Sequence, residues 1–264
     1  MIEGIDHVQL AAPPGCEQRA SEFFAGVLGM QEIEKPAALA VRGGVWFRCG
    51  AQHLHVGVEQ GFVPAAKAHP ALLVGAGGID ELAERVAAAG LPVRWDDELP
   101  YVRRFYTADP FGNRLELTTA ALAISWLVPG GSLEGALALR EQVFCGEQGV
   151  SLEEERDGRD EEALHLLASV GDRVVGTLRL LLDGEVAKVG RVAVERVWRG
   201  RGIAARMLAL ALQEASERGA AQARLAAQTD AVALYEQAGF EVVSEEFLDA
   251  GIVHVWMSMA LGRG

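Results

Sequence analysis

The chain has few cysteines and no long apolar run, and each shortage excludes a class of protein. Its three cysteines, Cys16, Cys49 and Cys145, are widely spaced and odd in number, so they form neither a disulfide framework nor a zinc-finger pattern. No apolar stretch reaches the length of a membrane span, and Glu3 and Asp6 interrupt the start of the chain, so a signal peptide is not expected. These absences predict a cytoplasmic protein that does not enter a membrane.

Basic residues are also scarce. The chain has 24 Lys and Arg against 37 Asp and Glu, a formal net charge of −13, and both halves are acidic. Nucleic-acid binding needs a basic face, so it is excluded as a main role. The acidic stretch over residues 153–162 either attracts a cationic amine or forms a solvated loop. With 264 residues, 50% of them hydrophobic, the chain suits two domains with cores of ordinary size.

A glycine-rich turn is the most informative feature of the sequence. Arg199-Gly200-Arg201-Gly202-Ile203-Ala204 follows the apolar run Val192–Val194, which predicts a strand, and precedes the Ala/Leu-rich segment 205–215, which predicts a helix. Glycines let the backbone approach a bulky anion, and the first turn of a helix presents unpaired N–H groups. The two arginines add donors for phosphate oxygens. The turn therefore predicts a pyrophosphate site.

The turn resembles the Q/R-x-x-G-x-G/A signature of GNAT N-acetyltransferases, which binds the pyrophosphate of coenzyme A. Arg199, Gly202 and Ala204 occupy its three defining positions. The resemblance implies acetyl-CoA as the cofactor, with its pantetheine arm hydrogen-bonded to the backbone of the preceding strand. The expected cofactor-binding residues are Val192, Ala193, Val194, Arg199, Gly200, Arg201, Gly202, Ile203, Ala204 and Gln228.

A second element further along the chain supports the same family. Residues 230–240 have the apolar spacing of a short helix that Gly239 ends, and they resemble the Tyr-Glu-x-x-Gly-Phe element of GNAT proteins. The resemblance implies that Tyr235 donates a proton to the leaving thiolate. The general base stays open between His165, His254, Glu147, Asp157 and a water molecule, and the predicted catalytic residues are Tyr235, His254 and His165.

Other segments resemble the ElaA-like branch of this family. They are Arg140–Phe144, Leu164–His165 and Gly251–His254. The resemblance covers residues 124–262, so we predict a GNAT domain over residues 123–264. It implies a small amine as acyl acceptor and does not name that amine.

The first half of the chain shows a different pattern, a duplication. Each unit consists of a strand, a helix and three strands. In the first unit the strand-like and helical runs are 5–10, 17–28 (helix), 40–41, 45–49 and 53–58. In the second unit they are 67–74, 79–89 (helix), 93–95, 104–107 and 114–118.

Polar residues follow the duplication. A histidine opens each unit, and each last strand carries a second polar residue of a metal-ligating type. A pseudo-twofold pairing of the units would bring these side chains to one cleft, where imidazole and carboxylate suit Zn, Ni, Fe or Mn. The predicted metal ligands are His7, His55, His69 and Glu116, with His53 as a rival for the fourth position and Glu59 as a lower-ranked carboxylate.

This half resembles the vicinal oxygen chelate superfamily of glyoxalases, bleomycin-resistance proteins and dioxygenases. Residues 23–29 and 109–116 carry the resemblance, together with the βαβββ duplication. The predicted fold is α+β, with a paired βαβββ domain over residues 1–122 and a GNAT mixed-sheet domain over 123–264. The resemblance leaves two activities open for the first domain, capture of a small molecule and metal-dependent lyase or dioxygenase chemistry. It also leaves open a homodimer through that domain.

Overall fold

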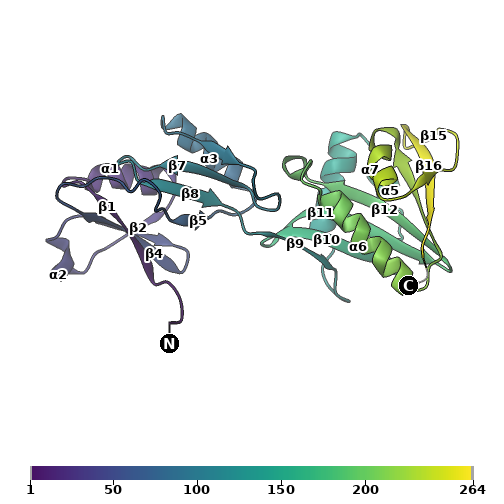
Figure 1. Ribbon diagram of the computed structural model, residues 1–264, viewed down its shortest axis with the longest axis horizontal. Helices are drawn as coiled ribbons and strands as arrows, with labels where there is room; N and C mark the ends of the chain where they lie inside the picture. Colours follow the sequence, from purple (N-terminus) through teal and green to yellow (C-terminus); the bar gives the residue numbers. More distant parts are fainter. Residues whose placement is uncertain (1, 263–264) are drawn as a thin grey trace. The chain divides into compact units, whose positions relative to one another are not determined.

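The computed structural model describes residues 2–262 and divides the chain between Ala121 and Leu122 into two compact units (Figure 1). Both units combine helices with sheets, so the predicted α+β class is confirmed. Within residues 2–262, no helix combines the length and the apolar composition that a bilayer crossing requires.

The N-terminal unit consists of two four-stranded sheets with the same strand order. The first sheet, in the order β1-β4-β3-β2, contains β1 (His7–Ala12), β2 (Gln31–Ile33), β3 (Val45–Cys49) and β4 (Gln52–Val58). The second, in the order β5-β8-β7-β6, contains β5 (Ala71–Leu73), β6 (Arg94–Asp96), β7 (Arg104–Ala108) and β8 (Arg114–Thr118). In each sheet the first and last strands pair in parallel, so the predicted duplication is confirmed.

Helices cover these sheets and close one core. They are α1 (Glu17–Ser21), which continues into the π-helical turn η1 (Glu22–Val27), α2 (Ala37–Ala40) and α3 (Ile79–Ala88). Phe24, Phe47, Ile79 and Phe105 are fully buried in one apolar cluster that includes residues of both sheets. Packing of this cluster, rather than hydrogen bonding, supplies most of the unit's stability.

One sequence prediction in this unit was wrong, and one strand was not predicted. Residues 40–41 were expected in a strand, but Ala37–Ala40 form α2, and the strand is β2 at Gln31–Ile33. Pro36 precedes α2, and its fixed φ suits the start of a helix. A strand of three residues is too short to show an alternating pattern.

The C-terminal unit contains one mixed sheet in the order β14-β16-β13-β12-β11-β10-β9, with β15 paired to β16. Its strands are β9 (Leu122–Trp126), β10 (Leu164–Val170), β11 (Arg173–Asp183), β12 (Val186–Val194), β13 (Gln222–Gln228), β14 (Glu241–Val242), β15 (Phe247–Asp249) and β16 (Ile252–Ala260). β12 and β13 are the only parallel neighbours among the described strands of this sheet, and the other pairs are antiparallel.

Helices pack on this sheet, and α6 crosses it (Figure 1). They are α4 (Glu134–Arg140), the π-helical η2 (Glu141–Glu147), α5 (Leu152–Glu155), α6 (Ile203–Glu217), α7 (Val232–Gln237) and the short turns η3 (Asp160–Glu162), η4 (Arg196–Trp198) and η5 (Thr229–Ala231). Residues 175–181 of β11 are buried without interruption, because both faces of the strand are covered. The predicted helix at 205–215 lies within α6.

β12 and β13 pair over a short distance and then separate. Their register runs only from Val186 to Lys188 of β12. Further along, Arg191 and Val192 lie opposite the single residue Leu178 of β11, which is a β-bulge. Arg191 has a φ of 51°, a conformation that costs an L-residue about 1–2 kcal/mol. The bulge and the separation open the sheet at its centre.

A buried network of ion pairs fixes the segment after α5 against the sheet. The Arg140 side chain is fully enclosed, and it donates to Glu155 and, at 2.7 Å from Nη1, to Asp160 Oδ1. Arg179 of β11 donates to both oxygens of Asp157, at 2.7 and 2.6 Å. The hydrogen bond from Arg179 holds the pKa of Asp157 well below its usual range, against the opposing effect of burial.

The network predicts a loss of stability in acid. Because the folded pKa of Asp157 lies below its ordinary value of 3.8, its contribution is complete above that value and is lost as the pH falls through the folded pKa. The variant Asp157→Asn should be less stable at neutral pH by about 1–2 kcal/mol and should unfold with a shallower dependence on pH below about 4. Thermal unfolding of the full chain at several pH values measures the change in stability. Amide hydrogen exchange in β11 shows whether the C-terminal unit is the part that is destabilised. Identical pH profiles of variant and wild type would contradict it.

Candidate functional site

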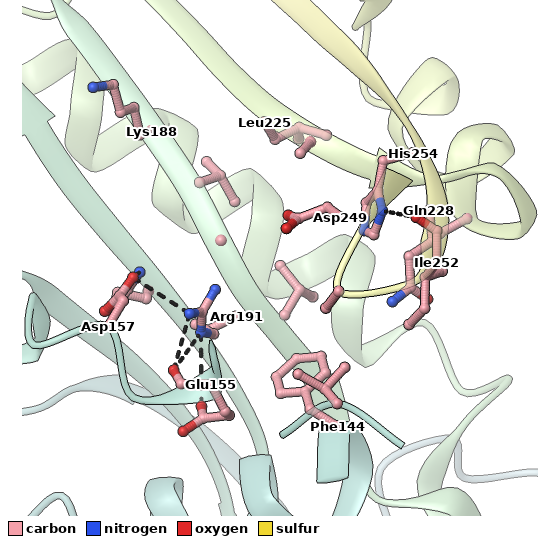
Figure 2. Close-up of a pocket in the computed structure, with 18 of the residues that line it drawn as sticks. Phe144, Glu155, Asp157, Lys188, Arg191, Leu225, Gln228, Asp249, Ile252 and His254 are labelled. Carbon is pink, nitrogen blue, oxygen red and sulfur yellow. Dashed lines mark hydrogen bonds and ion pairs between the residues drawn. The ribbon is translucent and has the colours of Figure 1, made fainter. Parts of the chain in front are cut away.

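The separated strands form one wall of a cavity of about 500 Å³ in the C-terminal unit (Figure 2). β12, β13 and β16 line it, together with the segment around α5, the turn between β15 and β16, and Tyr235 of α7. A volume of this size suits a small molecule. Of the site residues that the sequence predicted for this half of the chain, Val192, Gln228, Tyr235 and His254 line the cavity.

The end of β12 borders the opening in the sheet. Val192 lines the cavity, and Ala193 and Val194 pair with β11 opposite Thr177 and Gly176. The β12–β13 register ends at Lys188, so Val192–Val194 have no strand partner on the β13 side. Their backbone groups on that side can therefore pair with an extended ligand, in the manner of an added strand.

The glycine-rich turn leads directly into α6. Gly200 and Gly202 have φ values of 75° and 74°, and a β-carbon at either position would meet no atom within 4 Å. Glycine is therefore required there by the backbone conformation and not by crowding. The backbone N–H of Arg206 donates to Gly202 O at 3.0 Å, which is the first hydrogen bond of the helix. The N–H groups of Ile203, Ala204 and Ala205 precede it and have no partner within the helix. Such a helix start is favourable for a phosphate group.

Arg199 supports the turn with its side chain. Its Nε donates to Val194 O at 2.8 Å, and its Nη1 lies 2.8 Å from Glu147 Oε2. Glu147, one of the sequence candidates for the base, is therefore engaged by a guanidinium. Arg201 lies over the ring of the buried Trp198, 5.7 Å from its centroid.

Tyr235 projects from α7 into the cavity wall and is 8% exposed. Burial and the neighbouring charge of Asp230 raise the pKa of Tyr235 to about 12. Its hydroxyl is consequently protonated at neutral pH and can donate a hydrogen bond. Gln228 also lines the cavity, where its side-chain amide exchanges hydrogen bonds of 2.9 and 3.2 Å with that of Gln148.

The two candidate histidines lie in different places. His254 lines the cavity, and its Nδ1 lies 2.9 Å from Ile252 O (Figure 2). Its ring stacks on Phe247. His165 is not among the residues that line the cavity. Its ring is buried with Nε2 2.9 Å from Asp160 O. Asp157 lines the cavity but is held by Arg179.

Two features of this cavity were missed by the sequence analysis. Arg191 and Ala250 are the non-glycine residues with positive φ in the described chain, at 51° and 48°, and both line it. Backbone strain of this kind persists where surrounding structure enforces it, often at functional sites. The pair Ala250–Gly251 between two strand-like runs could have indicated a tight hairpin, whereas no sequence signal marks the bulge at Arg191. The hairpin also brings Asp249 to the cavity.

In the N-terminal unit, the four predicted metal ligands do not converge. The His7 and His55 rings stack with centroids 4.3 Å apart, and Trp46 stacks on the other face of His55. Burial, followed by the charge of His7, lowers the pKa of His55. In the second module, His69 lies two residues before β5, and its Nε2 is 3.2 Å from Glu116 Oε2. Within residues 2–262, no three His, Cys, Asp or Glu side chains are placed to hold a metal ion.

The four predicted ligands thus form two separate pairs within the described chain. The physical reason lies in the sheets: β1 pairs with β4, and β5 with β8, so each module brings its own two residues together. Arg104, 3.4 Å from Glu116 Oε1, further engages the carboxylate. A larger cavity of about 1000 Å³ lies along β1 and β5, where His53, Glu59 and His69 line it among mostly apolar side chains.

Comparison with known proteins divides the chain in the same way. The acetyltransferase (GNAT) domain model matches residues 132–261. The uncharacterized N-acetyltransferase YjcF of Bacillus subtilis is 37% identical over 126 residues, which make up 47% of this chain and 90% of YjcF. The structure of Escherichia coli ElaA is 24% identical, with a TM-score of 0.48, over 52% of this chain and 98% of ElaA.

The N-terminal half matches other structures. A Bacillus anthracis protein described as belonging to the glyoxalase family is 52% identical, with a TM-score of 0.43, over 45% of this chain and 95% of that protein. With YjcF matched over nearly its whole length, the C-terminal half of this chain belongs to the GNAT acetyltransferases, which are acyltransferase enzymes, and it is joined to an N-terminal half similar to the glyoxalase family.

Proposed function

We propose that the chain is an acetyl-CoA-dependent N-acetyltransferase that acts on a small amine. The observation that supports this most strongly is the left-handed pair Gly200 and Gly202 at the start of α6, next to a strand end, Val192–Val194, that has no partner strand on the β13 side. A pyrophosphate at the amides of Gly202–Ala204 would direct the pantetheine arm along Val192–Val194. The thioester would then lie at the cavity that Val192 and Tyr235 both line.

The reaction forms one bond and breaks one. The amine nitrogen attacks the thioester carbonyl, the new C–N bond forms, and the C–S bond breaks. Tyr235 stabilises the departing thiolate by donating a hydrogen bond. A thiol has an ordinary pKa of about 8.5, below that of Tyr235, so complete transfer of the phenolic proton is not required. The proton lost by the amine passes to a base, and coenzyme A departs as a thiolate, which takes up a proton from solvent after release.

His254 is the base in this proposal. Because a carbonyl oxygen only accepts, Nδ1 carries the proton in its contact with Ile252 O, which leaves the Nε2 lone pair basic. Asp157 is a poor base, since Arg179 holds its pKa low. His165 lies outside the cavity lining, and we leave it out of the proposed mechanism.

Removal of the Tyr235 hydroxyl tests its role. The variant Tyr235→Phe keeps the buried ring, so folding and acetyl-CoA affinity should change little, whereas kcat should fall about 10- to 100-fold. A thiol-release assay with a panel of small amines measures kcat, and a melting curve serves as the folding control. An unchanged kcat would remove Tyr235 from the mechanism.

A second prediction concerns the glycine turn. In Gly202→Ala the new methyl group points into the open space that the pyrophosphate would occupy, and we expect acetyl-CoA binding to weaken about tenfold or more. Gly171→Ala is the matched control, because Gly171 also has a positive φ and open space but lies in the turn between β10 and β11. Both variants should lose about 1 kcal/mol of stability. Calorimetric titration that found equal acetyl-CoA affinity in the two variants would argue against the proposed site.

For the N-terminal unit we propose a ligand-binding role in a homodimer. In one chain the pairs His7–His55 and His69–Glu116 are separate, so a divalent-metal site needs donors from two modules that face each other across two copies. No catalytic step is assigned to such a metal.

Light scattering combined with metal analysis tests this arrangement. We expect a dimer that retains metal when it is purified without chelator, and we expect His69→Ala to lose the metal. A monomer that binds one metal ion per chain would contradict the proposal. A dimer free of metal would limit the unit to ligand capture, the second function that the sequence left open.

A further inference from the structure

We propose that the acceptor is a small amino-acid-like zwitterion, an amine with a carboxylate on the neighbouring carbon. Arg191 would bind the carboxylate, and Asp249 would attract the amino group. This inference rests on the proposed acetyltransferase function and specifies its substrate class. Both residues line the cavity, on different elements (Figure 2).

The position of Arg191 favours a role in binding the acceptor. It directly precedes Val192, beside which the thioester would lie, so its side chain belongs to the acceptor end of the cavity. The bulge gives it a positive φ, and no glycine replaces it. An arginine at a strained position is more simply explained by a use for its side chain than by local folding preference.

Arg191 uses only part of its guanidinium for hydrogen bonds within the protein. Its Nε donates to Glu155 O at 3.1 Å, and its Nη2 donates to Glu154 O at 3.1 Å and to Glu155 O at 2.9 Å. All of its hydrogen bonds to described residues leave from Nε or Nη2. The two N–H groups of Nη1 are thus left for a ligand, in a fixed plane.

The carboxylates near Arg191 neutralise its charge only in part. The nearby carboxylates are engaged mainly by other arginines, since Asp157 is held by Arg179 at 2.6 Å and Glu155 by Arg140. Arg191 reaches Asp157 only at 3.3 Å. Burial and, after it, the charge of Arg179 lower the pKa of Arg191. A lowered pKa is expected for a buried cation whose charge the neighbouring carboxylates neutralise incompletely. An incoming carboxylate would complete the neutralisation.

Asp249 supplies the opposite charge. It ends β15 directly before the turn Ala250–Gly251, where both residues have positive φ, at 48° and 77°. In Figure 2 its side chain projects toward the strand that carries Lys188 and Arg191. Within residues 2–262, it has no hydrogen bond or ion pair to another side chain. A carboxylate in that position attracts an ammonium group, whose proton His254 on the adjoining strand can then remove.

The size of the cavity limits the acceptor. It must hold the thioester end of acetyl-CoA as well as the acceptor in about 500 Å³. Phe144, Leu225 and Ile252 contribute apolar surface to the lining of the cavity. A free amino acid or a short relative of one fits these conditions better than a peptide or a protein lysine.

Paired substrates test the proposal on the full chain. Each amino acid is compared with the amine that lacks only the carboxylate, at saturating acetyl-CoA. We expect kcat/KM to favour the carboxylated member by about 100-fold, because an arginine positioned for a carboxylate discriminates against its absence. Arg191→Gln and Arg191→Lys should reduce that preference at least about tenfold, with acetyl-CoA affinity within twofold of wild type.

Arg224→Gln is the matched control. Arg224 also lines the cavity, but it lies over the Trp256 ring 5.5 Å from the centroid, and the preference should survive its replacement. If the Arg191 variants do not fold, the wild-type comparison alone decides. Faster acetylation of the amines without a carboxylate overturns this inference and leaves the acetyltransferase proposal intact. Absence of acetyl-CoA binding overturns the proposed function itself, and the two failures are thereby distinguished.

Discussion

The C-terminal unit depends on one backbone constraint, the end of β12–β13 pairing at Lys188. A continuous ladder would have satisfied the backbone groups of Val192–Val194 and filled the centre of the sheet. The bulge at Arg191 diverts β12 instead, and the glycine turn that follows directs the chain into α6. That separation leaves the backbone of Val192–Val194 without a partner strand on the β13 side, beside the start of α6. It also opens the cavity that Tyr235 lines.

This opening requires compensation elsewhere in the unit. The network of Arg140, Arg179, Asp157 and Asp160 ties the segment after α5 to the sheet beside the gap. Paired charges in a protected site are stabilising only when every partner is present, so they fix one arrangement of the wall. Arg191 adds its hydrogen bonds to the same segment and keeps one edge of its guanidinium for the cavity. Stability and specificity therefore share residues in this region.

Sequence patterns predicted the elements that depend on local chemistry. The glycines at 200 and 202, the helix after them and the duplicated βαβββ order were all recognisable, because turn chemistry and periodicity are local properties. The short strand β2 and the bulge at Arg191 were not, since each depends on what the rest of the sheet does. The predicted metal ligands show the same dependence on the rest of the fold. Residue spacing placed the four ligands in equivalent positions of the two modules, but strand pairing within each module holds them as two separate pairs. Asp249 was missed because only a hairpin brings it to the cavity.

The central claim is that the amides at the start of α6 hold the diphosphate of an acyl carrier while the thioester lies beside Val192. A crystal structure of the full chain with acetyl-CoA tests it most directly. The account predicts phosphate oxygens within hydrogen-bonding distance of the Gly202–Ala204 amides and the pantetheine arm extended along Val192–Val194. A nucleotide bound elsewhere on the chain, with α6 and the end of β12 unaltered, would contradict it.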